Sequence, residues 1–244
     1  MRTIRIYYNG NLTKGTSVAL SEQANQHLVH VLRLKAGDSI SLFNGENVEA
    51  VATVSTIHKK QSTVTISEVI TVNRESSLSL HLYQSILRSD KMDWVIQKAT
   101  ELGVTKITPV MTQFSQVKLT PDRLIKRMDH WQGIIISACE QCGRNQLPTL
   151  NEPIRFSTML DHTEIEKTFL FSPEADTHFH QLPVNSSDKI AFLIGPEGGF
   201  SPEEINLVKH SNITSLSLGP RILRTETAAI TAMSIFQNRL GDLF

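Results

Sequence analysis

Residues 193–200 are Leu193-Ile194-Gly195-Pro196-Glu197-Gly198-Gly199-Phe200, a short apolar run that stops at a glycine turn. A second run of this kind occurs later in the chain as Leu218-Gly219-Pro220-Arg221-Ile222-Leu223-Arg224. In α/β domains, buried strands that end in this way deliver their carboxyl ends to a ligand crevice. We therefore expect the two runs to build one site.

The first run predicts a strand followed by a helix. Ile190–Ile194 has the continuous apolar character of a strand buried on both faces. Ser201 is a good N-cap, Pro202 suits the first helical position, and Glu204 completes a capping box. We expect a helix to begin at Pro202.

The residues of the first turn restrict the ligand. Pro196 removes a backbone N–H donor, Glu197 adds a negative charge, and no G-x-G-x-x-G motif occurs, so phosphate and nicotinamide dinucleotides fit poorly. A ligand with cationic character and ribose hydroxyls, such as S-adenosylmethionine, fits a glutamate better. A plain strand-turn-helix corner is the alternative for one such turn. The second turn, with its arginines and Glu226, favours a binding site.

These residues resemble a known family. Ile194–Ser201, and Leu218-Gly219 with Ile222-Leu223-Arg224 and Glu226-Thr227-Ala228, are similar to the two cofactor motifs of RsmE-type 16S rRNA (uridine-N3) methyltransferases, knotted enzymes of the SPOUT superfamily. The resemblance implies an α/β methyltransferase domain with a mainly parallel sheet, a C-terminal trefoil knot and a homodimer. It also implies S-adenosylmethionine as cofactor and 16S rRNA, free or in the small ribosomal subunit, as substrate.

The resemblance also implies site residues. The expected cofactor-binding residues are Phe171, Ser172, Ile194, Gly195, Glu197, Gly198, Gly199, Leu218, Gly219, Ile222, Leu223 and Thr227. Arg224 is expected to stabilise negative charge on a uracil oxygen. Glu226 is expected either to accept the N3 proton or simply to be a first-turn acid that the helix dipole favours.

The first part of the chain predicts a small β-barrel. Its expected strands are Thr3–Tyr8, Ser39–Phe43, Asn47–Val54 and Ser62–Val69, with one helix from Ser21 to about Leu32. His27-Leu28, Val31-Leu32-Arg33 and Gly37-Asp38 resemble the start of the same family, which implies a PUA-like RNA-binding barrel. The expected RNA-binding residues over the whole chain are Arg5, Arg33, Lys35, Arg88, Lys91 and Arg144.

A polar, aperiodic stretch, Asn73–Ser77, indicates a boundary between domains at 1–72 and 73–244. The second domain alternates strands and helices, which is typical of a parallel sheet. Its expected elements are strands at Leu78–Leu82, Lys106–Val110 and Thr168–Phe171, besides Ile190–Ile194, and helices at Lys91–Leu102, Pro121–Cys142 and Glu226–Leu240. Pro109 predicts that its strand lies at an edge or ends there.

One segment departs from the family pattern. Family members usually carry Glu-Arg-Ser after the second strand of this domain, whereas residues 113–116 are Gln113-Phe114-Ser115-Gln116, which lack the arginine. Between Arg88 and Arg127 there are eight lysines or arginines against four acidic residues, which indicates either a phosphate track or a solvated helix face.

Composition sets broad bounds. The 244 residues are 40% hydrophobic and 20% charged with a formal net charge of zero, so RNA binding has to rest on a local patch. No apolar run approaches a membrane span and the N-terminus lacks a signal-peptide core, which predicts a cytoplasmic protein. The last helix is apolar on more than one face, which predicts burial against a second subunit.

Two pairs of potential metal ligands or thiols carry weaker signals. Cys139 and Cys142 form a C-x-x-C, but they fall late in a long helix without a second pair, so we expect neither redox chemistry nor zinc. His27 and His30 lack an evident third ligand, and no metal site is predicted. The alternative function that the sequence leaves open is a non-catalytic RNA-binding protein that uses the crevice for another nucleotide.

Overall fold

The computed structural model describes residues 4–115, 120–161 and 167–243. These residues form two compact units. The first consists of Met1–Glu75 together with Ile136–Leu147, and the second of Ser76–Ile135 together with Pro148–Phe244. The long helix α3 (Pro121–Cys142) therefore contributes its last turns to the first unit.

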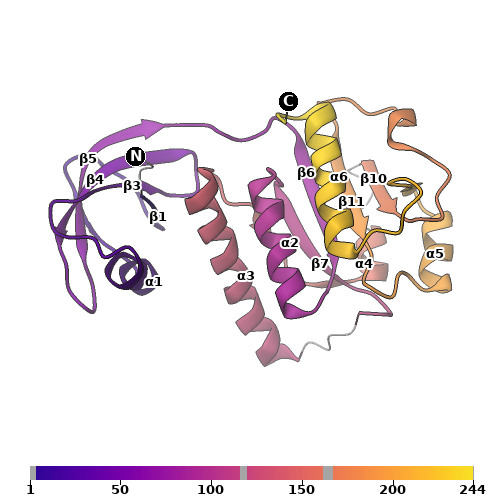
Figure 1. Cartoon of the computed structure of the whole chain (residues 1–244), viewed down its shortest axis with the longest axis horizontal. Helices are drawn as coiled ribbons and strands as arrows, with labels where there is room; N and C mark the ends of the chain where they lie inside the picture. The colour runs from indigo at the N-terminus through magenta and orange to yellow at the C-terminus, as the bar shows by residue number, and fades with distance from the viewer. Residues whose placement is uncertain (1–3, 116–119, 162–166, 244) are drawn as a thin grey trace. The chain divides into compact units, whose positions relative to one another are not determined.

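The first unit is built on a curled, five-stranded sheet that resembles a half-barrel (Figure 1). The strand order is β1-β3-β4-β5-β2, with β1 parallel to β3 and all other pairs antiparallel. The strands are β1 (Arg5–Tyr7), β2 (Ser17–Ala19), β3 (Ser39–Phe43), β4 (Val48–Thr56) and β5 (Thr63–Thr71). The three-residue strand β2 was not predicted, because it is too short to show an alternating pattern.

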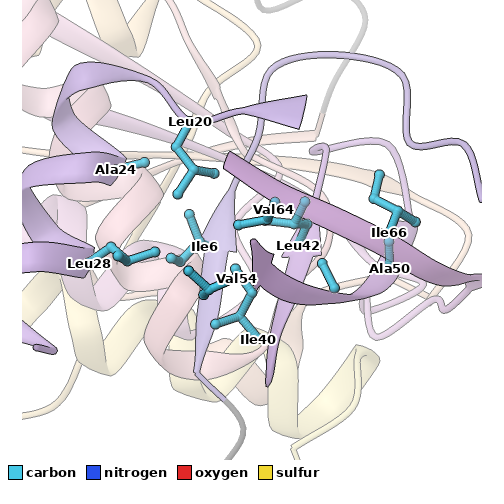
Figure 2. Close-up of a cluster of buried hydrophobic side chains, with 11 residues drawn as sticks. Ile6, Leu20, Ala24, Leu28, Ile40, Leu42, Ala50, Val54, Val64 and Ile66 are labelled. Carbon is cyan, nitrogen blue, oxygen red and sulfur yellow. The ribbon is translucent and has the colours of Figure 1, made fainter. Parts of the chain in front are cut away.

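The core of the first unit lies between this sheet and α1 (Glu22–Gln26). Figure 2 shows aliphatic side chains from the strands meeting Ala24 and Leu28. Ser21, at the predicted start of this helix, is its N-cap and accepts a hydrogen bond from the Ala24 N–H at 3.2 Å. The helix then continues as one π-helical segment, η1 (His27–Val31), and Arg33 comes shortly after it with a φ of 53°.

The second unit contains a parallel sheet with the order β12-β10-β11-β6-β7-β8, and β9 also pairs with β7. Every pairing in it among the described residues is parallel, as predicted. The strands are β6 (Ser79–Ser85), β7 (Lys106–Met111), β8 (Thr149–Leu150), β9 (Ile154–Arg155), β10 (Lys167–Phe171), β11 (Lys189–Ile194) and β12 (Thr214–Leu216).

Helices cover both faces of this sheet. Phe156 and Met159 of α4 (Phe156–Asp161) and Val208 of α5 (Pro202–Lys209) share a core with Leu170 and Leu193 on one face. On the other face, Phe236 of α6 (Thr225–Leu240) contacts the rings of β10 and β11, and α2 (Ser89–Glu101) lies beside α6 (Figure 1). The trefoil knot stays a prediction.

Pro109 lies inside β7, which pairs with β6 on one side and with the short strands β8 and β9 on the other. The Ile107 carbonyl accepts from the Asn151 N–H on the outer side of β7, and the Val110 carbonyl accepts from the Ile86 N–H on the inner side. Backbone N–H and C=O groups point to alternate sides along a strand, so the nitrogen of Pro109 faces the outer side, as Ile107 does. Pro109 lies there between the residues paired with β8 and the residues paired with β9. The missing N–H therefore falls in the gap between β8 and β9 and deprives neither strand of a donor. The predicted edge or terminal position is wrong, because β7 has neighbours on both sides and continues to Met111.

The described helices include none that combines the length and apolar character needed to cross a membrane. Helices α2, α3, α5 and α6 begin within two residues of their predicted starts. The predicted end of α2 at Leu102 is followed by Gly103, whose φ of 79° favours glycine. The short elements β8, β9, α4 and β12 were not predicted.

Candidate functional site

Four neighbouring parallel strands end at one edge of the second unit's sheet. They are β12, β10, β11 and β6, in that order. The glycine turn at residues 195–199 comes directly after β11, and the second glycine run comes after β12. The Ser172 N–H, just after β10, donates to the Leu216 carbonyl at 2.9 Å and keeps these ends together.

The first turn is held in a single conformation by its own backbone and by α5. The Gly199 N–H donates to the Pro196 carbonyl at 2.9 Å, and Gly199 has a φ of 71°, which favours glycine. At Gly195, a Cβ would lie 2.9 Å from the Phe200 ring. The predicted capping box is present, since Ser201 Oγ accepts from the Glu204 N–H and Glu204 Oε2 accepts from the Ser201 N–H.

A hydroxyl joins the two glycine runs. Thr225 Oγ1, at the start of α6, donates a hydrogen bond to the Gly195 carbonyl. Gln84 Nε2, near the end of β6, lies 3.5 Å from the same Oγ1. The structure thus brings together the end of β6, the turn after β11 and the segment that comes after the second run.

Charged side chains meet beside this link. Lys91 Nζ lies 3.1 Å from Glu197 Oε1 and 3.6 Å from Glu226 Oε2. The three side chains are 27%, 25% and 17% exposed, respectively. The expected RNA contact Lys91 is therefore paired with an expected cofactor ligand and an expected catalytic residue.

Several buried polar atoms near the crevice lack a hydrogen-bond partner within the described part of the chain. They are Gln84 Oε1, Ser85 Oγ and Glu226 Oε2. Gln84 and Ser85 are completely buried. Buried acceptors of this kind bind water or a ligand that carries N–H donors or positive charge. This observation fits the donor-rich, cationic ligand expected from the sequence.

The remaining expected cofactor residues differ in exposure. Phe171 is buried and packs edge-on against Phe192 and Phe236, so its ring belongs to the core. Ile222 is 85% exposed, and nothing in the described chain covers it. Ile194 is buried, Ser172, Gly195, Leu218, Gly219 and Leu223 are half-buried, and Gly198, Gly199, Arg224 and Thr227 are exposed. Glu197 is exposed as a whole residue, although its side chain is only 25% exposed.

The segment that departs from the family pattern lies against the first glycine turn. The Gln113 N–H donates to Glu204 Oε1 at 2.8 Å, and a Cβ on Gly198 would lie 3.2 Å from Phe114 Cβ. Ser115 Oγ lies 2.8 Å from Thr112 Oγ1. Gln116 lies outside the described residues. Sequence reasoning noted the missing arginine here, but no local signal connected Phe114 to Gly198.

Two of the expected RNA contacts are buried in an ion-pair cluster of the first unit. Arg5 Nη1 lies 2.8 Å from Glu49 Oε2, and Arg144 Nε donates to Glu75 Oε2 at 2.8 Å. The Arg5 and Arg144 side chains are only 10% and 7% exposed. This arrangement differs from the expectation that they face RNA, and it gives both a structural role.

Three further expected RNA contacts lie at the surface. Arg33 and Lys35 are exposed after η1, and Arg88 is exposed at the N-cap of α2. The Lys35 N–H donates to Asp38 Oδ2 at 2.7 Å, which fixes the turn that carries the lysine. These two basic side chains, Arg33 and Lys35, are available to phosphate groups.

Glu49 is the centre of the buried cluster. It accepts hydrogen bonds from Ser41 Oγ and Asn145 Nδ2 besides its ion pairs with Arg5 and Arg74. Burial by itself would raise the pKa of Glu49, but the bonds from Arg74, Ser41, Asn145 and Arg5 outweigh it and lower the pKa to about 2.

The cysteine pair and the histidine pair show no reactive arrangement. Both cysteines are free thiols, and burial raises the pKa of Cys139 to about 12, which disfavours the thiolate. His27 Nδ1 lies 3.7 Å from Glu140 Oε2, whose carboxyl pKa is raised by burial. Among the residues that the structure describes, no three His, Cys, Asp or Glu side chains are placed to hold a metal ion.

Comparison with known proteins agrees with this architecture. Residues 74–237 match the family of RNA methyltransferase domains, and residues 21–67 match the RNA methyltransferase PUA domain. The ribosomal RNA small subunit methyltransferase E of Buchnera aphidicola subsp. Schizaphis graminum is 36% identical over 243 residues, which cover 99% of this chain and 98% of that protein.

Solved structures give the same result. A protein from Legionella pneumophila, in complex with the cofactor SAM, is 46% identical with a TM-score of 0.97, and the match covers both chains completely. The ribosomal RNA small subunit methyltransferase E of Neisseria gonorrhoeae, bound to S-adenosyl methionine, is 34% identical with a TM-score of 0.91, again over both whole chains. The domain match, the full-length identity and the fold together show that this chain belongs to the RNA methyltransferase family.

Proposed function

We propose that this protein transfers a methyl group from S-adenosylmethionine to N3 of a uridine in 16S rRNA. The observation that carries the proposal is the hydrogen bond from Thr225 to Gly195, which joins the two motifs that resemble the cofactor motifs of RsmE-type enzymes. The relatives named ribosomal RNA small subunit methyltransferase E, one of them bound to S-adenosyl methionine, support the cofactor and the rRNA substrate.

The residues of the crevice would hold the cofactor between the two runs. The turn at 195–199 borders the ribose, and the segment at 218–223 borders the adenine, where Ile222 needs an apolar cover. The unpartnered acceptors Gln84 Oε1 and Ser85 Oγ fit a ligand with amino groups. When bound, S-adenosylmethionine supplies a methyl group on a positively charged sulfur.

The protein's part in the reaction is alignment and proton removal. Glu226, half-buried at the start of α6, accepts the N3 proton of the uracil. Arg224, exposed two residues earlier, stabilises the negative charge that develops on a uracil oxygen. Alignment of the nucleophile with the methyl group supplies a large part of the rate enhancement.

The test is methylation of 16S rRNA by the purified protein. Isotope-labelled S-adenosylmethionine is incubated with 16S rRNA, free or within small ribosomal subunits, from cells that lack this methylation. Digestion and mass spectrometry should then detect labelled 3-methyluridine. If the protein binds RNA and a nucleotide but transfers no label to either substrate, the alternative of a non-catalytic RNA-binding protein takes its place.

We also propose that the protein is a homodimer and acts in the cytoplasm, where small ribosomal subunits are assembled. An open groove of about 890 Å³ lies on the outer face of α6 and is lined by Phe179, His180, Ile230, Thr231, Ser234, Ile235, Asn238 and Arg239. It does not coincide with the crevice. Its half-buried isoleucines support a contact with a second subunit.

The first unit is proposed to dock RNA. Arg33 and Lys35 supply exposed positive charge there, and the match of residues 21–67 to the PUA domain of RNA methyltransferases supports the assignment. Because the formal net charge of the chain is zero, a local pair of this kind has to provide the attraction to phosphate.

A further inference from the structure

One ammonium group holds three segments of the second unit at the crevice. Lys91 belongs to the first turn of α2, Glu197 to the turn after β11, and Glu226 to the first turn of α6. Its Nζ atom lies 3.1 Å from Glu197 Oε1 and 3.6 Å from Glu226 Oε2. These segments are far apart in the sequence.

Local helix chemistry does not account for this lysine. The N-terminus of a helix carries partial positive charge, so a lysine in the first turn is disfavoured and an acid is favoured. Asp90 and Glu226 obey this rule in their helices, whereas Lys91 violates it. Lys98, in the last turn of α2, obeys the rule and pairs with Glu101 at 2.8 Å. The position of Lys91 therefore reflects its tertiary partners.

The two carboxylates that contact Lys91 need a positive charge between them. Glu197 and Glu226 both approach the same nitrogen, so without it two carboxylates would face each other at close range and repel. Glu226 Oε2 is also buried without a hydrogen-bond donor in the described part of the chain. Removal of the ammonium would leave that oxygen uncompensated and would weaken the link between the turn at 195–199 and α6, which would then rest on the Thr225–Gly195 hydrogen bond.

We propose that Lys91 is a positioning residue that holds the glycine turn and Glu226 in place for the cofactor, rather than a contact to RNA phosphate. This inference rests on the proposed function, because it takes the crevice as the cofactor site. The side chain is only 27% exposed and its charge is already engaged by two carboxylates. A phosphate group would have to compete with both.

The first experiment measures binding of S-adenosylmethionine by calorimetry to the full-length protein and to Lys91→Met, Lys91→Arg and the control Lys98→Met. A partly exposed ion pair with two partners predicts a roughly five- to tenfold loss of affinity in Lys91→Met. Lys91→Arg should recover part of it, and Lys98→Met should bind like the unmodified protein. Thermal denaturation verifies that each variant is folded.

A double-variant cycle tests the geometry. In a Glu197→Gln background, Lys91→Met should cost less affinity than in the unmodified protein, because one of its two partners is already neutral. If Lys91→Met has the same effect in both backgrounds, or the same affinity as Lys98→Met, the proposed contact does not position the turn and the inference is wrong.

The second experiment measures the salt dependence of binding to a 16S rRNA fragment. Lys91→Met should leave the slope of log affinity against log salt unchanged, whereas loss of a phosphate contact lowers the slope by about 0.7 to 0.9. A lowered slope with unchanged cofactor affinity would make Lys91 an RNA contact. Both experiments measure binding and do not depend on methyl transfer. If the unmodified protein transfers no methyl group, the proposed reaction is wrong, but these binding measurements still decide the role of Lys91.

Discussion

Thr225 Oγ1 donates a hydrogen bond to the carbonyl oxygen of Gly195, thirty residues earlier in the chain. The hydroxyl also lies within 3.5 Å of Gln84 Nε2, so one side chain connects the carboxyl ends of β6 and β11 to the N-terminus of α6. Neither glycine run contains this threonine. The cofactor site that we propose therefore depends on a residue at an unspecified position within its second motif as well as on the motif residues.

Thr225→Val removes that hydroxyl while keeping the shape of the side chain. We expect the lost hydrogen bond to cost about 1 kcal/mol, which corresponds to roughly fivefold weaker binding of S-adenosylmethionine if the cost falls on the bound state. Thr225→Ser keeps the donor and should bind like the unmodified protein. Calorimetry on the two variants makes the comparison, and equal affinities would show that the hydroxyl is dispensable.

Gly198→Val should abolish binding of S-adenosylmethionine and leave the protein folded. The backbone of Gly198 does not need a left-handed conformation, but a Cβ there would already lie 3.2 Å from Phe114 Cβ. Larger side chains must point into the crevice or displace Phe114. Gly198→Ala should have an intermediate effect. A folded valine variant with unchanged affinity, measured by calorimetry and thermal denaturation, would remove this turn from the site.

Glu49→Gln should reveal how the buried cluster stabilises the protein. The pKa of Glu49 is lowered to about 2 in the folded protein from 4.5, so its contribution is fully present above pH 4.5 and is lost as the pH falls toward 2. We expect the unmodified protein to exceed the variant by roughly 2 kcal/mol in unfolding free energy at pH 7. The gap should narrow below pH 4.5. Denaturant titrations at several pH values measure it, and a gap that is independent of pH contradicts the assignment.

Arg33→Gln and Arg144→Gln should separate an RNA contact from a structural arginine. Arg33 is exposed, so its loss should lower the salt-dependence slope of rRNA binding by about 0.7 to 0.9 without destabilising the protein. Arg144 is buried against Glu75, so its loss should cost roughly 3 kcal/mol of stability and leave the slope unchanged in the fraction that stays folded. If Arg144→Gln lowered the slope and left the stability unchanged, Arg144 would be an RNA contact and not a structural residue.

The groove on the outer face of α6 should form the interface of the proposed homodimer. Ile235→Arg places a charge in the groove and should shift a dimer toward monomers in sedimentation equilibrium at micromolar concentration. The matched control is Ile125→Arg on α3, where the isoleucine is 63% exposed outside the groove. A clean monomer for the unmodified protein would exclude the proposed dimer.

The sequence predicted those parts of the fold that depend on local patterns. Pro121–Cys142 was predicted with its observed bounds because helical periodicity, N-terminal proline and length all agree. Short strands such as β2 and β12 carry too few residues for a period to show. The π-helical turn at His27–Val31 was not predicted, because α-helical spacing places Val31 on the side of Ala24 and Leu28, whereas Val31 is 68% exposed.

The candidate site was only partly predictable, because a motif specifies the turn at the end of its strand, whereas tertiary contacts decide which side chains lie beside that turn. The glycine turns and the capping box came from the sequence. The positions of Lys91, Phe114 and Gln84 against them depend on the order of strands in the sheet. Arg5 and Arg144 show the converse, because a basic residue that is expected to contact RNA can be the buried partner of an acid.

The composition of the first unit has a consequence for folding during synthesis. Asn145, contributed by the segment Ile136–Leu147, is fully buried in that unit and donates to the Val72 carbonyl, 73 residues earlier in the chain. When Val72 leaves the ribosome, this partner has not yet been translated. At a translation rate of about 5 to 20 residues per second, Asn145 is synthesised roughly 4 to 15 s after Val72, and the Val72 carbonyl has no Asn145 partner during that time. The N-terminal strands therefore emerge first, but their unit is completed only after the segment Ser76–Ile135 of the second unit has been made.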